Sequence, residues 1–188
     1  MELVIPERRY LDSYCDALRR RWSPNTVRAE VADEELAAIA EDADVFLQGK
    51  TDLEGLGRPI RQADGSTKRR LPGFSRWMWD GEFCGSINFR WQQGTVELPP
   101  HVLGHIGYTV VPWKRRTGLA SEALRQLLAL LDEIESIDLP YVELTTDVDN
   151  IGSQKVATAN GARLIERFQM PEELGGGVGF RYRIARWS

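Results

Sequence analysis

The sequence predicts an α/β fold, a single domain built on a mixed sheet with helices on both faces. Three observations support this prediction. The chain has 188 residues, of which 42% are hydrophobic and 28% charged, which is typical of one soluble globular domain. Segments rich in strand-forming residues alternate with segments of helical period. The clearest unit, residues 105–134, combines a strand, a tight basic turn and a long helix.

The N-terminal part of the chain is predicted to contain two helices and a long loop. Residues 2–5 can form a short edge strand that Pro6 ends. Apolar residues lie three and four apart in 7–22 and in 31–47, so we expect a helix in each segment. Residues 51–73 have no clear period and contain glycine, proline and basic residues. We expect a long loop there, and such loops are often functional or mobile.

The elements that follow are predicted from the spacing of apolar residues and from the positions of proline and glycine. Asp80 and Gly81 lie between two strand-rich runs of residues 75–91, which predicts a hairpin with a two-residue turn. Asn150 is a plausible N-cap, and Gly161 a plausible end, for a helix. The remaining expected elements are a loop at 94–100, strands at 104–111, 141–146, 163–168 and 179–184, helices up to about 134 and at 151–159, and a turn at 175–177.

The turn before the long helix has the features of an anion site. Pro112 stops the preceding strand, and Arg115 and Gly118 lie just before the helix. The unpaired N–H groups and the partial positive charge at a helix start attract anions. A glycine lets a ligand approach the backbone, and arginine suits phosphate. The pattern is that of a pyrophosphate site, although surface turns also carry arginine and glycine, and the pattern alone leaves both interpretations open.

Two common nucleotide-binding loops do not fit this turn. A P-loop requires a second glycine followed by lysine and serine or threonine, and these are missing between residues 112 and 121. A dinucleotide-binding loop requires three spaced glycines soon after a strand, and these are missing as well. The turn therefore belongs to neither class.

Two motifs, in this order, resemble the GNAT N-acetyltransferase superfamily. Arg115-x-x-Gly118-x-Ala120 is similar to the Arg/Gln-x-x-Gly-x-Gly/Ala signature with which that family binds the pyrophosphate of acetyl-coenzyme A (acetyl-CoA). Asn150-x-x-Ser153 and Asn160-Gly161-Ala162 resemble its Asn-x-x-Ser helix and the Asn-Gly-Phe/Ala that closes it. The resemblance extends over about residues 75–167. The two motifs together are more specific than either one alone.

The resemblance implies a single GNAT-like domain over residues 1–188, with a twisted and mostly antiparallel sheet. Residues 1–74 would form the acceptor side, 75–168 the core with the coenzyme motifs, and 169–188 a C-terminal strand. It also implies that the two central strands splay apart and that acetyl-CoA enters between them.

The resemblance also implies which residues contact the coenzyme. The backbone at Val110 and Val111 would pair with its acyl-amide arm. The positions that would bind the pyrophosphate are Arg115, Arg116, Thr117, Gly118, Leu119, Ala120 and Ser121. Asn150 and Ser153 resemble positions that touch the pantetheine arm and the phosphates. The same two residues also suit an N-cap and an ordinary first-turn serine, and Asn150 can do both.

Acetyl transfer to an amine requires a proton acceptor, because an amine with a pKa of about 10 is mostly protonated at neutral pH. In the family this group often lies on one of the two central strands. His105 lies on the first of these strands here, and Glu143 on the second, which makes them the catalytic candidates. A histidine on a strand is also commonly structural, and Glu143 also fits a solvated sheet face. Glu97 and His101 are weaker candidates.

One position departs from the family. Many members carry a tyrosine in the Asn150 helix that protonates the departing thiolate, and Ala157 occupies that position here. A thiol has a pKa of about 8.5, so it can leave as a thiolate with modest help. The general acid therefore stays unassigned.

The resulting hypothesis is an acetyl-CoA-dependent N-acetyltransferase that moves an acetyl group to a primary amine of a small molecule or peptide by direct attack on the thioester. The alternative is a non-catalytic acyl-CoA-binding or sensing module, and a third possibility is a homodimeric scaffold. An aminoglycoside-type acceptor would need an acidic cleft, which Asp42, Asp44 and Glu54 could supply. Acetyl-CoA would be the co-substrate, without a metal.

Bulk properties argue against several other classes. A net charge of −4 argues against a nucleic-acid-binding protein. Two cysteines, Cys15 and Cys84, are expected to be buried free thiols, and no Cys/His cluster has zinc spacing. No run approaches the roughly 20 apolar residues of a membrane span. The first residues lack the order of a signal peptide, so a cytoplasmic protein is expected.

Overall fold

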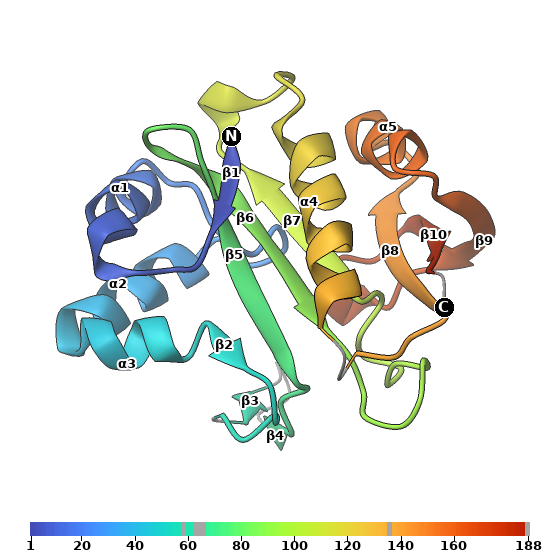
Figure 1. Ribbon diagram of the computed structural model, residues 1–188, viewed down its shortest axis with the longest axis horizontal. Helices are drawn as coiled ribbons and strands as arrows, with labels where there is room; N and C mark the ends of the chain where they lie inside the picture. The colour runs from blue at the N-terminus through green and yellow to red at the C-terminus, as the bar shows by residue number, and fades with distance from the viewer. Residues whose placement is uncertain (58, 62–66, 135–136, 187–188) are drawn as a thin grey trace.

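A computed structural model describes residues 1–57, 59–61, 67–134 and 137–186 (Figure 1). The helices are α1 (Arg8–Arg19), α2 (Val31–Glu41), α3 (Ala43–Gln48), α4 (Leu119–Glu133) and α5 (Ile151–Ala159). The strands are β1 (Glu2–Val4), β2 (Thr51–Asp52), β3 (Ile60–Arg61), β4 (Thr67–Lys68), β5 (Gly73–Trp79), β6 (Phe83–Arg90), β7 (Ile106–Val110), β8 (Tyr141–Asp147), β9 (Arg163–Gln169) and β10 (Val178–Ala185). Short 3₁₀ turns lie at Pro112–Lys114 and Glu172–Leu174.

Two antiparallel sheets form the framework. The larger has the order β1-β5-β6-β7, with β2 also paired to β5, and the smaller has the order β8-β10-β9. Strands β7 and β8 lie between the other strands of the two sheets, and their arrows point the same way and diverge in Figure 1. The pairings of the described residues include no ladder between β7 and β8. The two central strands are therefore splayed, as the resemblance implied.

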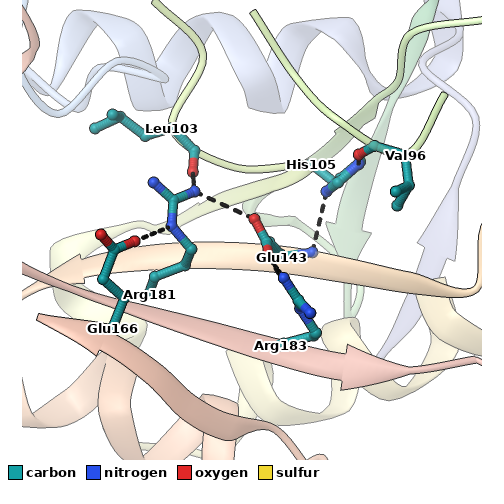
Figure 2. A network of polar contacts seen from close by, with 7 residues as sticks. All are labelled: Val96, Leu103, His105, Glu143, Glu166, Arg181 and Arg183. Carbon is teal, nitrogen blue, oxygen red and sulfur yellow. Dashed lines mark hydrogen bonds and ion pairs between the residues drawn. The ribbon is translucent and has the colours of Figure 1, made fainter. Parts of the chain in front are cut away.

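A strand joint, formed by Gly104, His105 and Glu143, holds the two sheets together where β7 begins (Figure 2). The N–H of His105 donates to the carbonyl of Glu143 at 2.8 Å, and the N–H of Glu143 donates to Nδ1 of His105 at 3.1 Å. Nε2 of His105 therefore carries the proton and donates to the carbonyl of Val96, 3.1 Å away. A Cβ on Gly104 would lie 3.0 Å from the Glu143 carbonyl oxygen and 3.1 Å from Cα of Leu144, so any other residue would push the two backbones apart.

Two arginines of β10 fix the side chain of Glu143 (Figure 2). Arg183 donates to one carboxylate oxygen at 2.7 Å, and Arg181 donates to the other at 3.2 Å. Arg181 also donates to the carbonyl of Leu103 at 2.8 Å and to Glu166 on β9 at 2.9 Å. This network links all three strands of the smaller sheet to the segment that enters β7.

Helix α4 packs against both sheets. Its apolar residues have the helical spacing expected from the sequence, and the fully buried ones are Ala123, Leu124, Leu127 and Leu131. They belong to one core cluster with Ile87 of β6 and with Val142 and Leu144 of β8. Burying each leucine stabilises the fold by roughly 1.5–3 kcal/mol. Helix α4 therefore covers the line along which the two sheets meet.

Helices α1 to α3, drawn in blue in Figure 1, enclose a second core on the other face of the larger sheet. Tyr14 of α1 stacks on Trp77 of β5 with ring centroids 4.3 Å apart, and Phe83 meets both rings edge-on. Trp77 and Met78 are neighbours on β5 but lie in different cores, as the alternation of a strand requires. Helices on both faces were predicted, and the structure confirms them.

The prediction of one helix over 31–47 was wrong. Asp42 has φ −157° and ψ 103°, an extended conformation that separates α2 from α3. Its carboxylate accepts the N–H groups of Asp44 at 2.9 Å and Val45 at 3.1 Å, and so caps α3. The capping hydrogen bonds of Asp42 therefore interrupt the helix, although the helical spacing of apolar residues continues through this position.

Two further expectations need correction. The expected loop at 51–73 contains the short strands β2, β3 and β4, although residues 58 and 62–66 lie outside the described part. The β5–β6 turn has three residues rather than two, because Trp79 pairs with Phe83 after a bulge. The expected boundaries of α5 are correct, and those of β7 to β10 agree within two residues.

Other expectations concern the cysteines and the membrane. Cys15 and Cys84 are buried free thiols, as predicted. In the described ranges, no helix is long and apolar enough to cross a membrane.

We expect Gly104→Val to destabilise the protein by about 1–3 kcal/mol, because the added side chain would overlap the backbone of Glu143 and Leu144. Urea unfolding measures this loss. Gly49→Ala is a matched control, since its Cβ would meet nothing closer than 3.4 Å. Equal stability of Gly104→Val and wild type would show that the strands do not approach one another in this way.

We expect acid to destabilise the strand joint. Burial lowers the pKa of His105 to about 4, and nearby Glu143 partly opposes this effect. An unfolded histidine has a pKa of about 6.5, so between these values the unfolded chain binds the extra proton. The free energy of unfolding should therefore fall by roughly 3 kcal/mol as the pH drops from about 6.5 to about 4. His105→Gln should show a flatter pH profile in urea unfolding, and parallel profiles would contradict the assignment.

Candidate active site

The start of α4 is a helix end without a side-chain cap. Gly118 is the N-cap residue, with φ +86° and no side chain bonded to the helix end. The first bond within the helix runs from the N–H of Glu122 to the carbonyl of Gly118 at 3.1 Å. The preceding N–H groups, those of Leu119, Ala120 and Ser121, have no partner within the helix. Apart from its chain neighbours, no described residue lies within 4 Å of where a Cβ of Gly118 would be, so the backbone is open at this point.

The loop before α4 presents two exposed arginines. Arg115 donates from Nε to the carbonyl of Val110 at 3.2 Å, and Arg116 has an unusual positive φ of 65°. Thr117 closes the loop by donating its hydroxyl to the carbonyl of Lys114 at 2.7 Å. Lys114 itself is bound to Asp80 and so ties this loop to the β5–β6 turn. The loop therefore carries two exposed arginines within four residues of the helix start.

The edge of β7 that faces β8 is unpaired along the splay. In an antiparallel ladder, backbone groups point alternately to the two sides. The N–H of Val111 donates to Cys84 on the β6 side at 2.9 Å, so the backbone groups of Val110 point toward β8. The Val110 carbonyl is occupied by Arg115, and the Val111 side chain is fully buried. The structure thus puts Val110, but not the Val111 N–H, on the free edge.

Helix α5 borders the other side of the splay. The Asn150 side chain accepts the N–H of Ser153 at 3.1 Å, so it caps the helix. Tyr108 reaches across from β7, and its hydroxyl lies 3.5 Å from the Ser153 carbonyl. Ala157, the position that carries a tyrosine in many relatives, is fully buried and contacts the core.

The two catalytic candidates lie together in the strand joint. His105 is 1% exposed, and both of its ring nitrogens have backbone partners. Both carboxylate oxygens of Glu143 accept hydrogen bonds from arginine. In this arrangement neither side chain offers a free atom to an acceptor amine.

A cavity of about 380 Å³ lies on the face of the larger sheet that α1 to α3 cover. Ser86, Asn88 and Arg90 of β6 line its floor, and their alternate positions share one face of the strand. Its walls include Glu35 of α2 and His101. This cavity is the candidate acceptor site, since it lies beside β7 and opposite the face that α4 covers.

The three acidic residues considered for a cationic acceptor do not line this cavity. Asp42 caps α3, and Asp44 pairs with Arg8 at 2.6 Å. Glu54 lines a separate cavity together with Lys68 and other basic residues. No group of three or more His, Cys, Asp or Glu side chains that could hold a metal occurs in the described part of the chain.

Sequence reasoning missed two residues of the site. Arg90 follows Ser86 and Asn88 at two-residue intervals, and this polar alternation in an otherwise apolar strand was a usable signal. Tyr108 lies in the expected strand at 104–111 without a motif of its own, and its contact with α5 is set by tertiary structure.

Solved structures resemble the whole chain in fold. The microcin C7 self-immunity acetyltransferase MccE, in complex with acetyl-CoA and AMP, is 13% identical with a TM-score of 0.62 over 98% of this chain and 91% of that one. RimL, the ribosomal L7/L12 alpha-N-protein acetyltransferase, in complex with coenzyme A, is 14% identical with a TM-score of 0.63 over 98% and 93%. RimJ of Mycobacterium smegmatis, with CoA-disulfide, is 17% identical with a TM-score of 0.59 over 97% and 80%.

Sequence comparison identifies the family. A search of curated proteins found no match to the chain. The profile described as acetyltransferase (GNAT) domain matches residues 14–163, which is most of the chain. The chain therefore belongs to the GNAT acetyltransferase family.

Proposed function

We propose that this protein is an acetyl-CoA-dependent N-acetyltransferase whose acceptor is a primary amine of a small molecule or peptide. The observation that carries the proposal is the open, uncapped start of α4 beside the free edge of β7. An anionic diphosphate satisfies the unpaired N–H groups there, and each such charge at a helix start contributes roughly 0.3–1 kcal/mol. The complexes of MccE and RimL with acetyl-CoA and coenzyme A support the same ligand.

The proposed coenzyme arrangement follows from the site. The diphosphate lies against the N–H groups from Thr117 to Ser121, and Arg115 turns from the Val110 carbonyl toward it. The pantetheine arm enters the splay, and its amide pairs with the backbone of Val110. Asn150 keeps its cap and offers its amide nitrogen to the arm.

The proposed reaction is direct transfer. The amine nitrogen attacks the thioester carbon, and the carbonyl oxygen becomes negative near the backbone N–H groups on the free edge of β7. The carbon–sulfur bond then breaks, and the coenzyme leaves as a thiolate. The amine proton passes to water in the cavity, whose wall includes His101. Burial and nearby Lys68 lower the pKa of His101, so it is neutral at pH 7 and can accept that proton.

We assign His105 and Glu143 a positioning role. Their engaged side chains fix where β7 and β8 meet and therefore where the splay begins. Removing either one should act through the geometry of the two strands, not through loss of a proton acceptor.

We further propose that Tyr108 donates the proton to the departing thiolate. Its hydroxyl lies 3.5 Å from the Ser153 carbonyl, one helical turn before the buried Ala157. Burial raises the pKa of Tyr108, so the hydroxyl keeps its proton at neutral pH. The phenol thus comes from the strand side of the splay and not from the helix.

Gly118→Glu should weaken acetyl-CoA binding about tenfold or more, because it places a negative charge against the diphosphate. Arg115→Ala should weaken it several-fold. Calorimetry measures both affinities. Gly94→Glu is the matched control. Gly94 also has a positive φ and open space where a Cβ would be, but it lies in a different loop, between β6 and β7.

A folded Gly118→Glu variant with wild-type affinity would remove the coenzyme site from α4. Release of free thiol in the presence of a panel of amines then separates an enzyme from an acyl-CoA-binding module. An enzyme releases coenzyme A in proportion to the acetylated amine.

Tyr108→Phe should lower kcat about tenfold or more, since a general acid typically contributes 10²–10⁴-fold, with the acetyl-CoA affinity nearly unchanged. Tyr10→Phe, which changes a tyrosine of α1 that packs on Trp79, is the control. An unchanged kcat in Tyr108→Phe would reduce Tyr108 to a structural contact.

A further inference from the structure

The floor of the acceptor cavity ends in Arg90, a half-buried arginine whose Nε atom is enclosed. Ser86, Asn88 and Arg90 point into the cavity from β6. The Nε of Arg90 is buried and has no hydrogen-bond partner among the described residues. Burial lowers the pKa of Arg90, and no nearby carboxylate opposes this effect. A buried cation without a counter-charge is costly, and proteins normally pair it.

The fold makes room for this guanidinium. An ideal Cβ on Gly107 of β7 would lie 2.9 Å from Nη2 of Arg90 and 3.2 Å from Oδ1 of Asn88. A side chain at position 107 would therefore displace both groups. Because Gly107 has none, the head of Arg90 lies over β7, the strand whose other edge borders the splay.

The carboxylates that line the cavity already have partners. Glu35 accepts hydrogen bonds from Lys50 at 2.9 Å and from the hydroxyl of Tyr14. Asp52 accepts the N–H groups of Leu56 and Gly57 at 3.0 and 2.8 Å. The lining contains four basic residues, Lys50, Arg69, Arg70 and Arg90, against these two acids. The cavity is therefore cationic on balance.

We propose that the acceptor carries an anionic group, a carboxylate or a phosphate, as well as its amine, and that Arg90 and Asn88 bind that group. The planar guanidinium suits both anions. The part of this inference that concerns the amine rests on the proposed acetyltransferase function, whereas the anion site does not depend on it.

The distances favour a small acceptor. Gly107, beneath the guanidinium, and Val110, on the free edge, are three residues apart on β7, a separation of about 10 Å. Three parts together fill this distance: a hydrogen bond between Arg90 and the anion, a short carbon chain between the anion and the amine, and van der Waals contact between the amine and the thioester. Amino acids have this size.

The first experiment compares amines that differ only in charge. The panel contains glycine, β-alanine and γ-aminobutyrate with their carboxamides, and phosphoethanolamine with ethanolamine. We expect kcat/KM to be at least about tenfold higher for the anionic member of a pair, and Arg90→Gln to abolish this preference. The carboxylate and phosphate pairs distinguish the two anions. Equal use of both members by wild type, or a preference that survives in Arg90→Gln, would overturn the proposal.

The second experiment needs no coenzyme. Glutarate or inorganic phosphate, compared with chloride at equal ionic strength, should raise the Tm of wild type by about 3 °C or more and leave that of Arg90→Gln unchanged. In chloride alone, Arg90→Gln and Arg90→Met should be at least as stable as wild type, because they remove a half-buried charge whose enclosed Nε has no hydrogen-bond partner among the described residues. If both variants were less stable than wild type, and glutarate and phosphate raised the Tm of wild type no more than chloride does, Arg90 would have a purely structural role.

Arg76→Gln is the matched control. Arg76 is also an arginine whose pKa burial lowers, but its head lies over Phe74 and donates to the carbonyl of Ser75. This variant should keep both the charge preference and the anion effect. Acetyl-CoA titration of the same proteins tests the coenzyme site separately. Anion stabilisation without coenzyme binding would reject the proposed function alone, and coenzyme binding without an Arg90-dependent anion effect would reject this inference alone.

Discussion

The hydrogen bonds between His105 and Glu143 determine how the two sheets meet. They connect β7 to β8 at one end, where Gly104 brings the backbones close enough for a direct bond. Beyond that point no ladder joins the two strands in the described chain, and they diverge toward the start of α4. The same contact therefore completes the core beneath α4 and produces the unpaired strand edge on which the proposed coenzyme site depends. The arginines around Glu143 fix this arrangement from the smaller sheet.

The parts of the fold that the sequence predicted well are those that local signals determine. The boundaries of α5 follow from the cap at Asn150 and the glycine after Asn160, both of which act within a few residues. The basic turn and the helix after it were likewise predicted from one continuous stretch, in which Gly118 proves to be the N-cap residue. The break at Asp42 was missed because its capping bonds compete with an apolar period that continues through it. The turn at Asp80 was predicted, but with two residues instead of three, because the pairing register shifts between Met78 and Trp79.

The proposed acceptor site was harder to predict because it combines distant segments. Glu35, Lys50, Arg90 and His101 line one cavity but come from a helix, a loop, a strand and another loop. No local pattern indicates that Glu35 has Lys50 as a partner while the Nε of Arg90 has none among the described residues. Similarly, the family resemblance implied that His105 and Glu143 lie on the two central strands but could not show that their polar atoms are engaged by backbone groups and by arginine. The charge of the cavity, basic where an acidic cleft was considered, is a property of the tertiary structure.

The closed end of the splay has a consequence for the chemistry of the acyl group. His105 and Glu143 bond across the strands five residues before Val110, so the splay is closed at that end. In the proposed arrangement, an acyl group that extends along the free edge of β7 toward this end would meet the joint after about 17 Å. The joint thus separates the proposed acyl position from the opposite end of the two strands.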